Sequence, residues 1–310
     1  MENTKTNFTY KSKDGSIIHA YKWGQKTPKT KAIIQISHGM AEHAGRYDEF
    51  AKTMVNENFI LYGNDHRGHG KNILDLRDLG YLGKTDGFIN LVRDMVSLTD
   101  IIKEENVGLP IILLGHSMGS FAAQRYIMDY PNKIQGLILS GSNGSQGFIL
   151  KFGKFLAKIE KTLRGDKAKS QILNKLSFGS YNKNFAPNRT EFDWLSRDEK
   201  SVDRYINDSY CGTVFPASFY YEFFDTLEYI ENSNNFGKIS KDLPILIISG
   251  ADDPVGGFGK SVQNLYKRYE SIGIEKLDYN LYDGVRHEPL NEINRDEIIS
   301  DIIQWANKII

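Results

Sequence analysis

Short apolar runs alternate with amphipathic stretches along most of the chain, and this rhythm predicts strands that alternate with helices. The runs typical of buried strands cover residues 31–37, 59–63, 110–115, 134–140, 244–249 and 276–282. The stretches with helical periodicity cover residues 47–57, 90–105, 118–129, 258–271 and 295–309. Strands joined by helices form a mainly parallel sheet covered on both faces. The pattern therefore predicts an α/β fold.

Two parts of the chain depart from this rhythm. Residues 7–12 and 16–23 alternate around Asp14-Gly15, which is typical of a β-hairpin and predicts two antiparallel strands. From residue 142 to 241 the chain is polar, is rich in Asn, Lys and Phe, and has no long apolar run of the strand type. We predict that residues 142–241 form a cap, inserted into a core made of residues 1–141 and 242–310.

The segment Gly115-His116-Ser117-Met118-Gly119 lies between an apolar run and a helical stretch. A strand, a tight turn with a serine and a helix make up the nucleophile elbow of serine hydrolases. Both glycines are expected because a side chain at either position would collide with a neighbouring strand or helix. The pentapeptide alone is moderately specific, but its flanks favour Ser117 as a nucleophile.

A serine nucleophile needs a base that accepts its proton and an acid that orients the base. His287 is the only histidine C-terminal to Ser117, and it follows the last predicted strand. Asp252 and Asp253 follow the strand before it. Such loops meet at the carboxyl edge of a parallel sheet, where active sites form. We favour Asp253 as the acid because Pro254 biases it to an extended backbone, and Asp252 stays an alternative.

The oxyanion of an acyl-transfer intermediate needs two backbone N–H donors. The elbow supplies the amide of Met118. The second donor should follow an early strand, where the chain has Ser37-His38-Gly39-Met40, so we nominate the Met40 amide. His38 is expected to shape this loop through hydrogen bonds, and a role as a second base is its alternative.

Several longer motifs occur in a fixed order along the chain. They are His38-Gly39-Met40-Ala41-Glu42-His43-Ala44-Gly45-Arg46-Tyr47, Asp65-His66-Arg67-Gly68-His69-Gly70, the elbow, Asp253-Pro254-Val255 and His287. With them the chain resembles the monoacylglycerol lipases and lysophospholipases of the α/β-hydrolase superfamily, which include serine aminopeptidase S33-type hydrolases. The resemblance implies an α/β-hydrolase fold and the same site: Ser117, Asp253, His287 and the amides of Met40 and Met118. Many members have a small residue where this chain has Met40, which leaves the preferred acyl length open.

Composition narrows the classes of function. Lys and Arg together number 39, as do Asp and Glu, so no net charge favours nucleic acid. Cys211 is the single cysteine, which excludes an intrachain disulfide; we expect a packed thiol and no metal site. Residues 1–5 lack the apolar core of a signal peptide, and no apolar run is long enough to span a bilayer, which predicts a soluble, cytoplasmic protein.

The predicted cap holds two apolar sets. One recurs at helical spacing among basic residues: Phe148, Phe152, Phe155, Ile159 and Leu163. Such a helix can touch a membrane surface transiently or line the mouth of an apolar pocket, and its alternative is an ordinary helix whose apolar stripe packs onto the core. The other is an aromatic stretch that can line an acyl site or pack inside the cap: Trp194, Tyr205, Tyr210, Phe215, Phe219, Tyr220, Phe223 and Phe224.

These observations predict a serine carboxylic-ester hydrolase that acts, without a cofactor, on a small-molecule lipid ester with a single acyl chain. One alternative is a peptidase of the prolyl-aminopeptidase type, which would need an acidic pocket for the substrate's ammonium group. The basic bias of residues 151–169 argues against that pocket. A second alternative is a binding or receptor protein whose hydrolysis is incidental. The sequence does not predict an oligomeric state.

Overall fold

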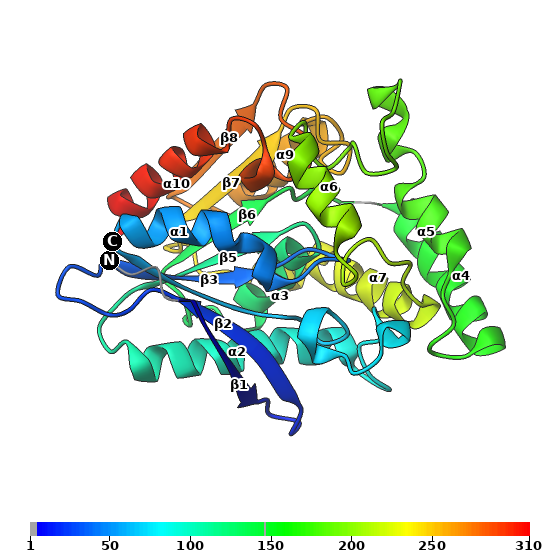
Figure 1. Cartoon of the computed structure of the whole chain (residues 1–310), viewed down its shortest axis with the longest axis horizontal. Helices are drawn as coiled ribbons and strands as arrows, with labels where there is room; N and C mark the ends of the chain where they lie inside the picture. Colours follow the sequence, from blue (N-terminus) through cyan, green and yellow to red (C-terminus); the bar gives the residue numbers. More distant parts are fainter. Residues whose placement is uncertain (1–4, 146) are drawn as a thin grey trace.

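An eight-stranded sheet forms the centre of the molecule in the computed structural model, which describes residues 5–145 and 147–310 (Figure 1). Its strands are β1 (Lys5–Lys11), β2 (Ile17–Trp23), β3 (Ala32–Ser37), β4 (Phe59–Asn64), β5 (Ile111–His116), β6 (Gly136–Ser140), β7 (Ile245–Gly250) and β8 (Leu277–Tyr282). They lie in the order β1-β2-β4-β3-β5-β6-β7-β8. β2 pairs antiparallel with β1 and β4, and the strands from β4 to β8 are parallel. The predicted α/β fold is confirmed.

Helices cover both faces of the sheet. The helices are α1 (Asp48–Asn56), α2 (Gly87–Glu105), α3 (Met118–Asp129), α4 (Phe148–Arg164), α5 (Gln171–Phe178), α6 (Glu199–Asn207), α7 (Ala217–Glu231), α8 (Ser233–Phe236), α9 (Lys260–Ser271) and α10 (Arg295–Ile309). α1 and α10 pack on one face, and α2, α3 and α9 pack on the other.

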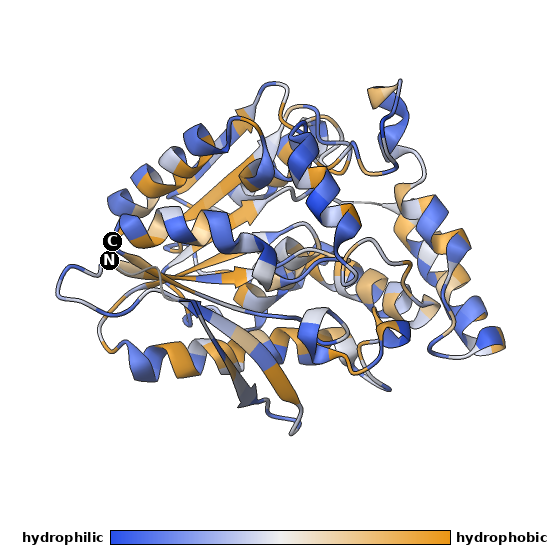
Figure 2. Cartoon of the chain, in the orientation of Figure 1, coloured by the Kyte–Doolittle hydropathy of each residue, from blue (hydrophilic) through white to orange (hydrophobic). Residues whose placement is uncertain are grey.

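β5 shows why the sheet is buried on both sides. Its six residues are all buried. Ile111 and Leu113 join the apolar cluster on the α2 and α3 face, whereas Ile112 and Leu114 join the cluster on the α1 and α10 face. Side chains of a strand alternate between the two faces, so a continuous apolar run suits a strand covered twice. Figure 2 shows such hydrophobic colouring along the central strands.

The strand order places one crossing point beside the elbow. β3 lies between β4 and β5 in the sheet. The chain therefore adds β4 on one side of β3 and then β5 on the other side. Ser37 at the end of β3 is in register with Gly115 of β5. Ligands of open α/β sheets bind outside the carboxyl ends of strands where the order reverses. This edge therefore brings the loop after β3 next to the elbow after β5.

Most predicted elements are present with small shifts in their ends. The largest shift is in α2, which begins at Gly87 instead of residue 90. Asp86, the residue before it, has a left-handed backbone (φ 53°). The amide of Phe88 donates to Glu222 of α7 at 2.7 Å. The start of this helix thus depends on a partner far along the chain, which local periodicity does not reveal.

The long segment between β6 and β7 holds α4 to α8 and none of the strands in the described sheet, and α7 packs against α2 and α3. The division into a core and a cap stays a prediction. On α4, Phe152, Phe155 and Leu163 are 55, 61 and 79% exposed. The alternative in which this stripe packs onto the core is therefore wrong for these residues; Leu150 and Ala157 on another side of α4 are buried instead.

Residues 1–4, which entered the signal-peptide argument, lie outside the described residues, as does the side chain of Phe148. Among the described helices, none is both long enough and apolar enough to cross a bilayer.

Gly250, the last residue of β7, lies very close to the backbone of the loop after β8. A Cβ built on Gly250 would lie 1.9 Å from the Val285 carbonyl oxygen and 2.4 Å from that of Arg286. Gly250→Ala is therefore expected to lower the free energy of unfolding by about 1–3 kcal/mol, as overpacking does, measured by urea denaturation. Gly237→Ala is the control, since its Cβ would meet atoms at 3.4 Å or more. Equal effects of the two variants would contradict this reading.

Candidate functional site

Ser117 occupies a strained turn between β5 and α3. Its φ is +50° and its ψ is −122°, a conformation that costs energy for any residue with a side chain. A Cβ on Gly119 would lie 2.0 Å from the Ser37 carbonyl oxygen, and one on Gly115 would lie 2.5 Å from the Gly119 carbonyl oxygen. Both glycines are thus required for the turn, as the sequence predicts.

Ser117, His287 and Asp253 lie together at the carboxyl edge of the sheet. The Ser117 Oγ lies 2.9 Å from His287 Nε2. His287 Nδ1 lies 3.0 and 3.1 Å from the two carboxylate oxygens of Asp253. With the ring proton on Nδ1, His287 donates to Asp253 and accepts from the serine hydroxyl. Asp252, the alternative acid, is exposed, and its amide donates to the Val285 carbonyl.

The surroundings of His287 favour its charged form. The residue is 3% exposed, and burial alone would lower its pKa. The Asp253 carboxylate, helped by Glu288 and Glu42, outweighs burial and raises the pKa of His287 above its ordinary value. A base that forms an imidazolium while it accepts a proton is stabilised by such a neighbour.

The loop after β3 passes directly beside Ser117. A Cβ on Gly39 would lie 3.3 Å from the Ser117 Cβ. The Gly39 amide donates to the Glu42 carboxylate at 2.6 Å, and Met40 follows it on the wall of the cavity that holds Ser117. Met118 begins α3, immediately after Ser117. The two nominated amides thus belong to backbone on either side of the serine.

A buried ion-pair network beneath this loop was not predicted. Arg46 donates to Glu42 at 2.7 Å and binds both carboxylate oxygens of Glu288, at 2.7 and 2.8 Å. Burial would raise the pKa of Glu288, but Arg46 outweighs burial and holds it well below its ordinary value. Glu42 and Arg46 stand four residues apart, a spacing that could have suggested their pairing. Glu288 offered no such local signal.

His38 lies in a separate group of buried histidines. Its Nε2 accepts from the His66 amide at 2.9 Å, and its Nδ1 lies 2.8 Å from the Gly39 carbonyl. These contacts are those expected of a residue that shapes the loop. The ring of His38 also packs against those of His66 and His69, at 4.1 and 5.2 Å between centroids.

Burial lowers the pKa of His38, His66, His69 and His116, the last two to about 4. In the unfolded chain these histidines have ordinary pKa values near 6.5. At pH values between the lowered folded-state pKa and 6.5, the unfolded chain therefore binds more protons than the folded protein, and the free energy of unfolding falls as the pH falls. Each of these four histidines lowers the free energy of unfolding by about 1 kcal/mol as the pH falls from about 7.5 to 5.5. His287, whose pKa is raised, has the opposite effect on stability over this range. We expect a net loss of about 2 kcal/mol or more by urea denaturation. Equal stability at both pH values would contradict it.

A cavity of about 640 Å³ opens onto Ser117 and His287. Its walls are partly aromatic and apolar, from Phe178, Trp194, Leu195, Tyr205 and Val214. Its polar lining includes Gln171, Asn174, Lys175 and Asn188. The Trp194 ring lies 5.1 Å from that of His287, so the segment between β6 and β7 reaches the site. The volume is in the range of cavities that enclose a small organic ligand.

Known proteins resemble the chain over nearly its whole length. The family model described as serine aminopeptidase, S33, matches residues 28–294. Human monoglyceride lipase is 25% identical over 95% of this chain and 88% of its own length. A monoglyceride lipase homolog of monkeypox virus is 33% identical over 94% of this chain and 95% of its own length.

A solved structure agrees with these relatives. A highly thermostable carboxyl esterase from Bacillus coagulans superposes with a TM-score of 0.90 at 26% identity, and the match covers 99% of each chain. The family match, the relatives and this neighbour point to one class of enzyme. The chain therefore belongs to the serine aminopeptidase S33 family and is a serine hydrolase of the α/β-hydrolase superfamily, an ester hydrolase similar to monoacylglycerol lipases.

Proposed function

We propose that the protein hydrolyses the ester of a lipid with a single acyl chain, a monoacylglycerol or a lysophospholipid. The observation that carries the proposal is the cavity at Ser117, in which aromatic and apolar walls lie beside a polar lining. An acyl chain suits the first part, and a glycerol or phosphoglycerol head group suits the second. The relatives named as monoglyceride lipases support the same class of substrate.

In this proposal Ser117 is the nucleophile, His287 the base and Asp253 the acid. Ser117 attacks the ester carbonyl as His287 takes its proton, and the amides of Met40 and Met118 hold the oxyanion. His287 then protonates the departing alcohol, which leaves an acyl-enzyme. A water molecule that gives its proton to His287 attacks the acyl-enzyme, and the fatty acid leaves.

Charge beside the site favours an ester over a peptide with a free amino terminus. An aminopeptidase needs a carboxylate that can pair with the ammonium group of its substrate. Three carboxylates line the cavity. Glu191 is exposed, whereas Glu42 and Glu288, next to His287, are both already paired with Arg46. To bind an ammonium group, either would have to give up a buried ion pair, which is strongly unfavourable.

The test is steady-state hydrolysis by wild type and Ser117→Ala on p-nitrophenyl esters of increasing acyl length, 1-monoacylglycerol, lysophosphatidylcholine and a prolyl-arylamide. Turnover that depends on Ser117 and rises with acyl length supports the proposal, and the two lipids then rank the head groups. Cleavage of the arylamide in preference to the esters would support the peptidase alternative. No turnover dependent on Ser117 would overturn the proposal and favour a binding role.

We further propose that the inserted segment touches a membrane surface through an exposed apolar patch. The patch lies on α4 and α5, at the edge of the molecule in Figure 1, and consists of Phe152, Phe155, Ile159, Leu163, Ile172 and Leu176. Lys151 and Lys158 are exposed on α4 beside it. Apolar side chains flanked by lysines suit the surface of a bilayer with anionic lipids.

Replacing two residues of this patch, Phe155→Ser with Leu163→Ser, should weaken binding to vesicles of phosphatidylcholine and phosphatidylglycerol by at least about ten-fold, since the pair exposes large apolar surface. Co-sedimentation measures the binding. Ile17→Ser with Val107→Ser is the matched control, because these residues are 62 and 77% exposed outside the patch. Similar binding by both double variants would contradict the proposal.

A further inference from the structure

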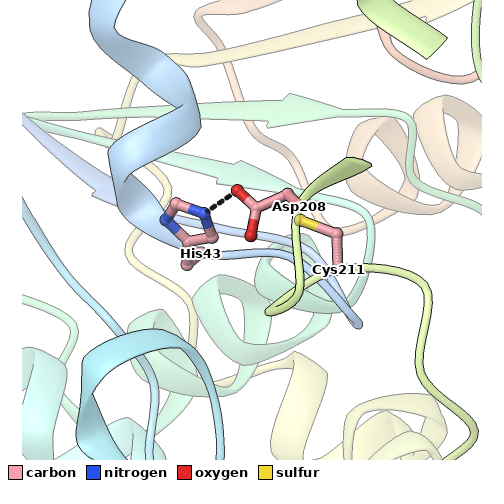
Figure 3. Close-up of side chains that lie close together, drawn as sticks. All are labelled: His43, Asp208 and Cys211. Atoms are coloured by element: carbon pink, nitrogen blue, oxygen red, sulfur yellow. Dashed lines mark hydrogen bonds and ion pairs between the residues drawn. The ribbon is translucent and has the colours of Figure 1, made fainter. Parts of the chain in front are cut away.

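His43, Asp208 and Cys211 form a second cluster of reactive side chains, shown in Figure 3. One nitrogen, one carboxylate oxygen and one sulfur lie within 4.8 Å of one another. His43 comes from the loop after β3, and the other two come from the turn after α6. His43 Nε2 lies 2.9 Å from Asp208 Oδ2, although the two residues are 165 positions apart.

The distance along the chain explains why the sequence predicted no metal site at Cys211. The prediction of a thiol with no Cys/His cluster around it rested on neighbours in the sequence, and His43 is not one of them. All three residues are partly buried in the structure. Burial also raises the pKa of the Cys211 thiol above its ordinary value, so the group is protonated when no metal is bound.

The donor set suits one class of cation. Zinc binds imidazole nitrogen, thiolate sulfur and carboxylate oxygen at about 2.0–2.3 Å in tetrahedral geometry, which separates ligand atoms by about 3.3–3.7 Å. The three ligand atoms now lie within 4.8 Å of one another, so zinc would draw the sulfur closer, and His43 Nε2 and Asp208 Oδ2 would separate slightly from their present 2.9 Å. His43 and Asp208 also line an open cavity of about 850 Å³, which leaves room for water as a fourth ligand.

The charges around the cluster help to choose among cations. Lys71, Lys200 and Arg204 line the same cavity, with Asp203 as a further carboxylate. Arg46, which is paired with Glu42 and Glu288, also places a positive charge close enough to interact electrostatically with Cys211. These cations weaken a site held by oxygen alone, as Mg²⁺ or Ca²⁺ would need. A metal that bonds strongly to thiolate is favoured over both.

We propose that His43, Asp208 and Cys211 bind a zinc ion that joins the inserted segment to the loop after β3. On binding, the Cys211 thiol loses its proton to solvent. The hydrogen bond from His43 Nε2–H to Asp208 Oδ2 is broken, and neutral His43 then carries its proton on Nδ1 through exchange with solvent while Nε2 binds the metal. The Tyr210 amide donates to Asp208 Oδ1 at 2.9 Å, which orients the carboxylate and leaves Oδ2 toward His43.

The position of the ion gives it a consequence for the active site. The residue after Cys211, Gly212, donates its amide to the Ala41 carbonyl at 3.0 Å. Ala41 follows Met40, and both line the cavity that holds Ser117. Zinc at the cluster therefore holds the turn of residues 208–212 against the loop that carries one nominated oxyanion donor.

The experiment uses the whole chain of 310 residues, with Cys211 as its own reporter because it is the only cysteine in it. The rate of thiol modification by Ellman's reagent is followed as zinc sulfate is added, and binding of about one equivalent should slow it at least ten-fold. EDTA should restore the rate. Cobalt(II) in place of zinc should give a thiolate-to-metal absorption band, which a nearby but unbound thiol does not give.

His43→Gln and Asp208→Asn should each weaken zinc protection at least ten-fold, whereas Asp203→Asn, in the same cavity but outside the cluster, should change it less than about three-fold. Circular dichroism confirms that each variant is folded, and His43→Gln keeps the test valid if Asp208→Asn is not. Unchanged thiol reactivity at about 1 mM zinc would overturn the inference. So would protection that is equal in wild type and His43→Gln.

Discussion

Ser117→Ala is expected to lower kcat by about four to six orders of magnitude while the protein stays folded. The loss follows because alanine has no oxygen to attack the ester, and removal of a triad nucleophile leaves only the catalysis from oxyanion binding and substrate positioning. Folding should survive because the variant keeps the Cβ that the elbow already accommodates at φ +50°. Steady-state hydrolysis of a p-nitrophenyl ester measures the effect.

The matched control is Ser97→Ala, which removes a hydroxyl on α2 that donates to the Arg93 carbonyl. It should keep kcat within about two-fold of wild type. Urea denaturation of Ser117→Ala separates a catalytic loss from misfolding, with stability expected within about 1 kcal/mol of wild type. If Ser117→Ala retained more than about 1% of wild-type kcat, another group would have to be the nucleophile.

The fold was largely predictable from the sequence because the parallel strands are buried on both faces. A strand such as β5 must then be continuously apolar, and that signal is visible locally. The helices between the strands are visible too, because their apolar residues recur at spacings of three and four. The segment between β6 and β7 was less predictable, because its helices pack on partners far along the chain. The apolar stripe of α4 shows the difficulty: its period predicts a helix, but the face that is buried, with Ala157, lies elsewhere.

The residues of the proposed site also differ in how far the sequence could predict them. Ser117 and the glycines around it could be predicted because the elbow is short and each residue in it has a local reason. His287 and the two aspartates could be predicted because the fold fixes which loops meet. The Arg46 network was not predicted, and Trp194 was named as a residue that can line an acyl site without its contact with His287, since both contacts join segments distant in the sequence. Contacts of this kind depend on packing, which periodicity does not encode.

Asp253→Asn is the substitution expected to have the next largest effect, a loss of about 10⁴-fold in kcat. Asp253 lies 3.0 Å from His287 Nδ1, and an amide there no longer holds the histidine in the tautomer that accepts the serine proton. The neutral amide also lacks the negative charge by which Asp253 raises the pKa of His287. Because only neutral His287 is a base, the acid limb of kcat/KM should lie above pH 6.5 in wild type and move to lower pH in the variant.

The adjacent aspartate makes a matched control that differs by one position in the chain. Asp252 is exposed, so Asp252→Asn should change kcat less than about three-fold and leave the acid limb in place. A purely structural role for Asp253 would lower activity without moving that limb, which distinguishes orientation of the base from support of the loop. If Asp252→Asn were the damaging variant instead, the loop would present its carboxylate one residue earlier, and Asp253 could not be the acid.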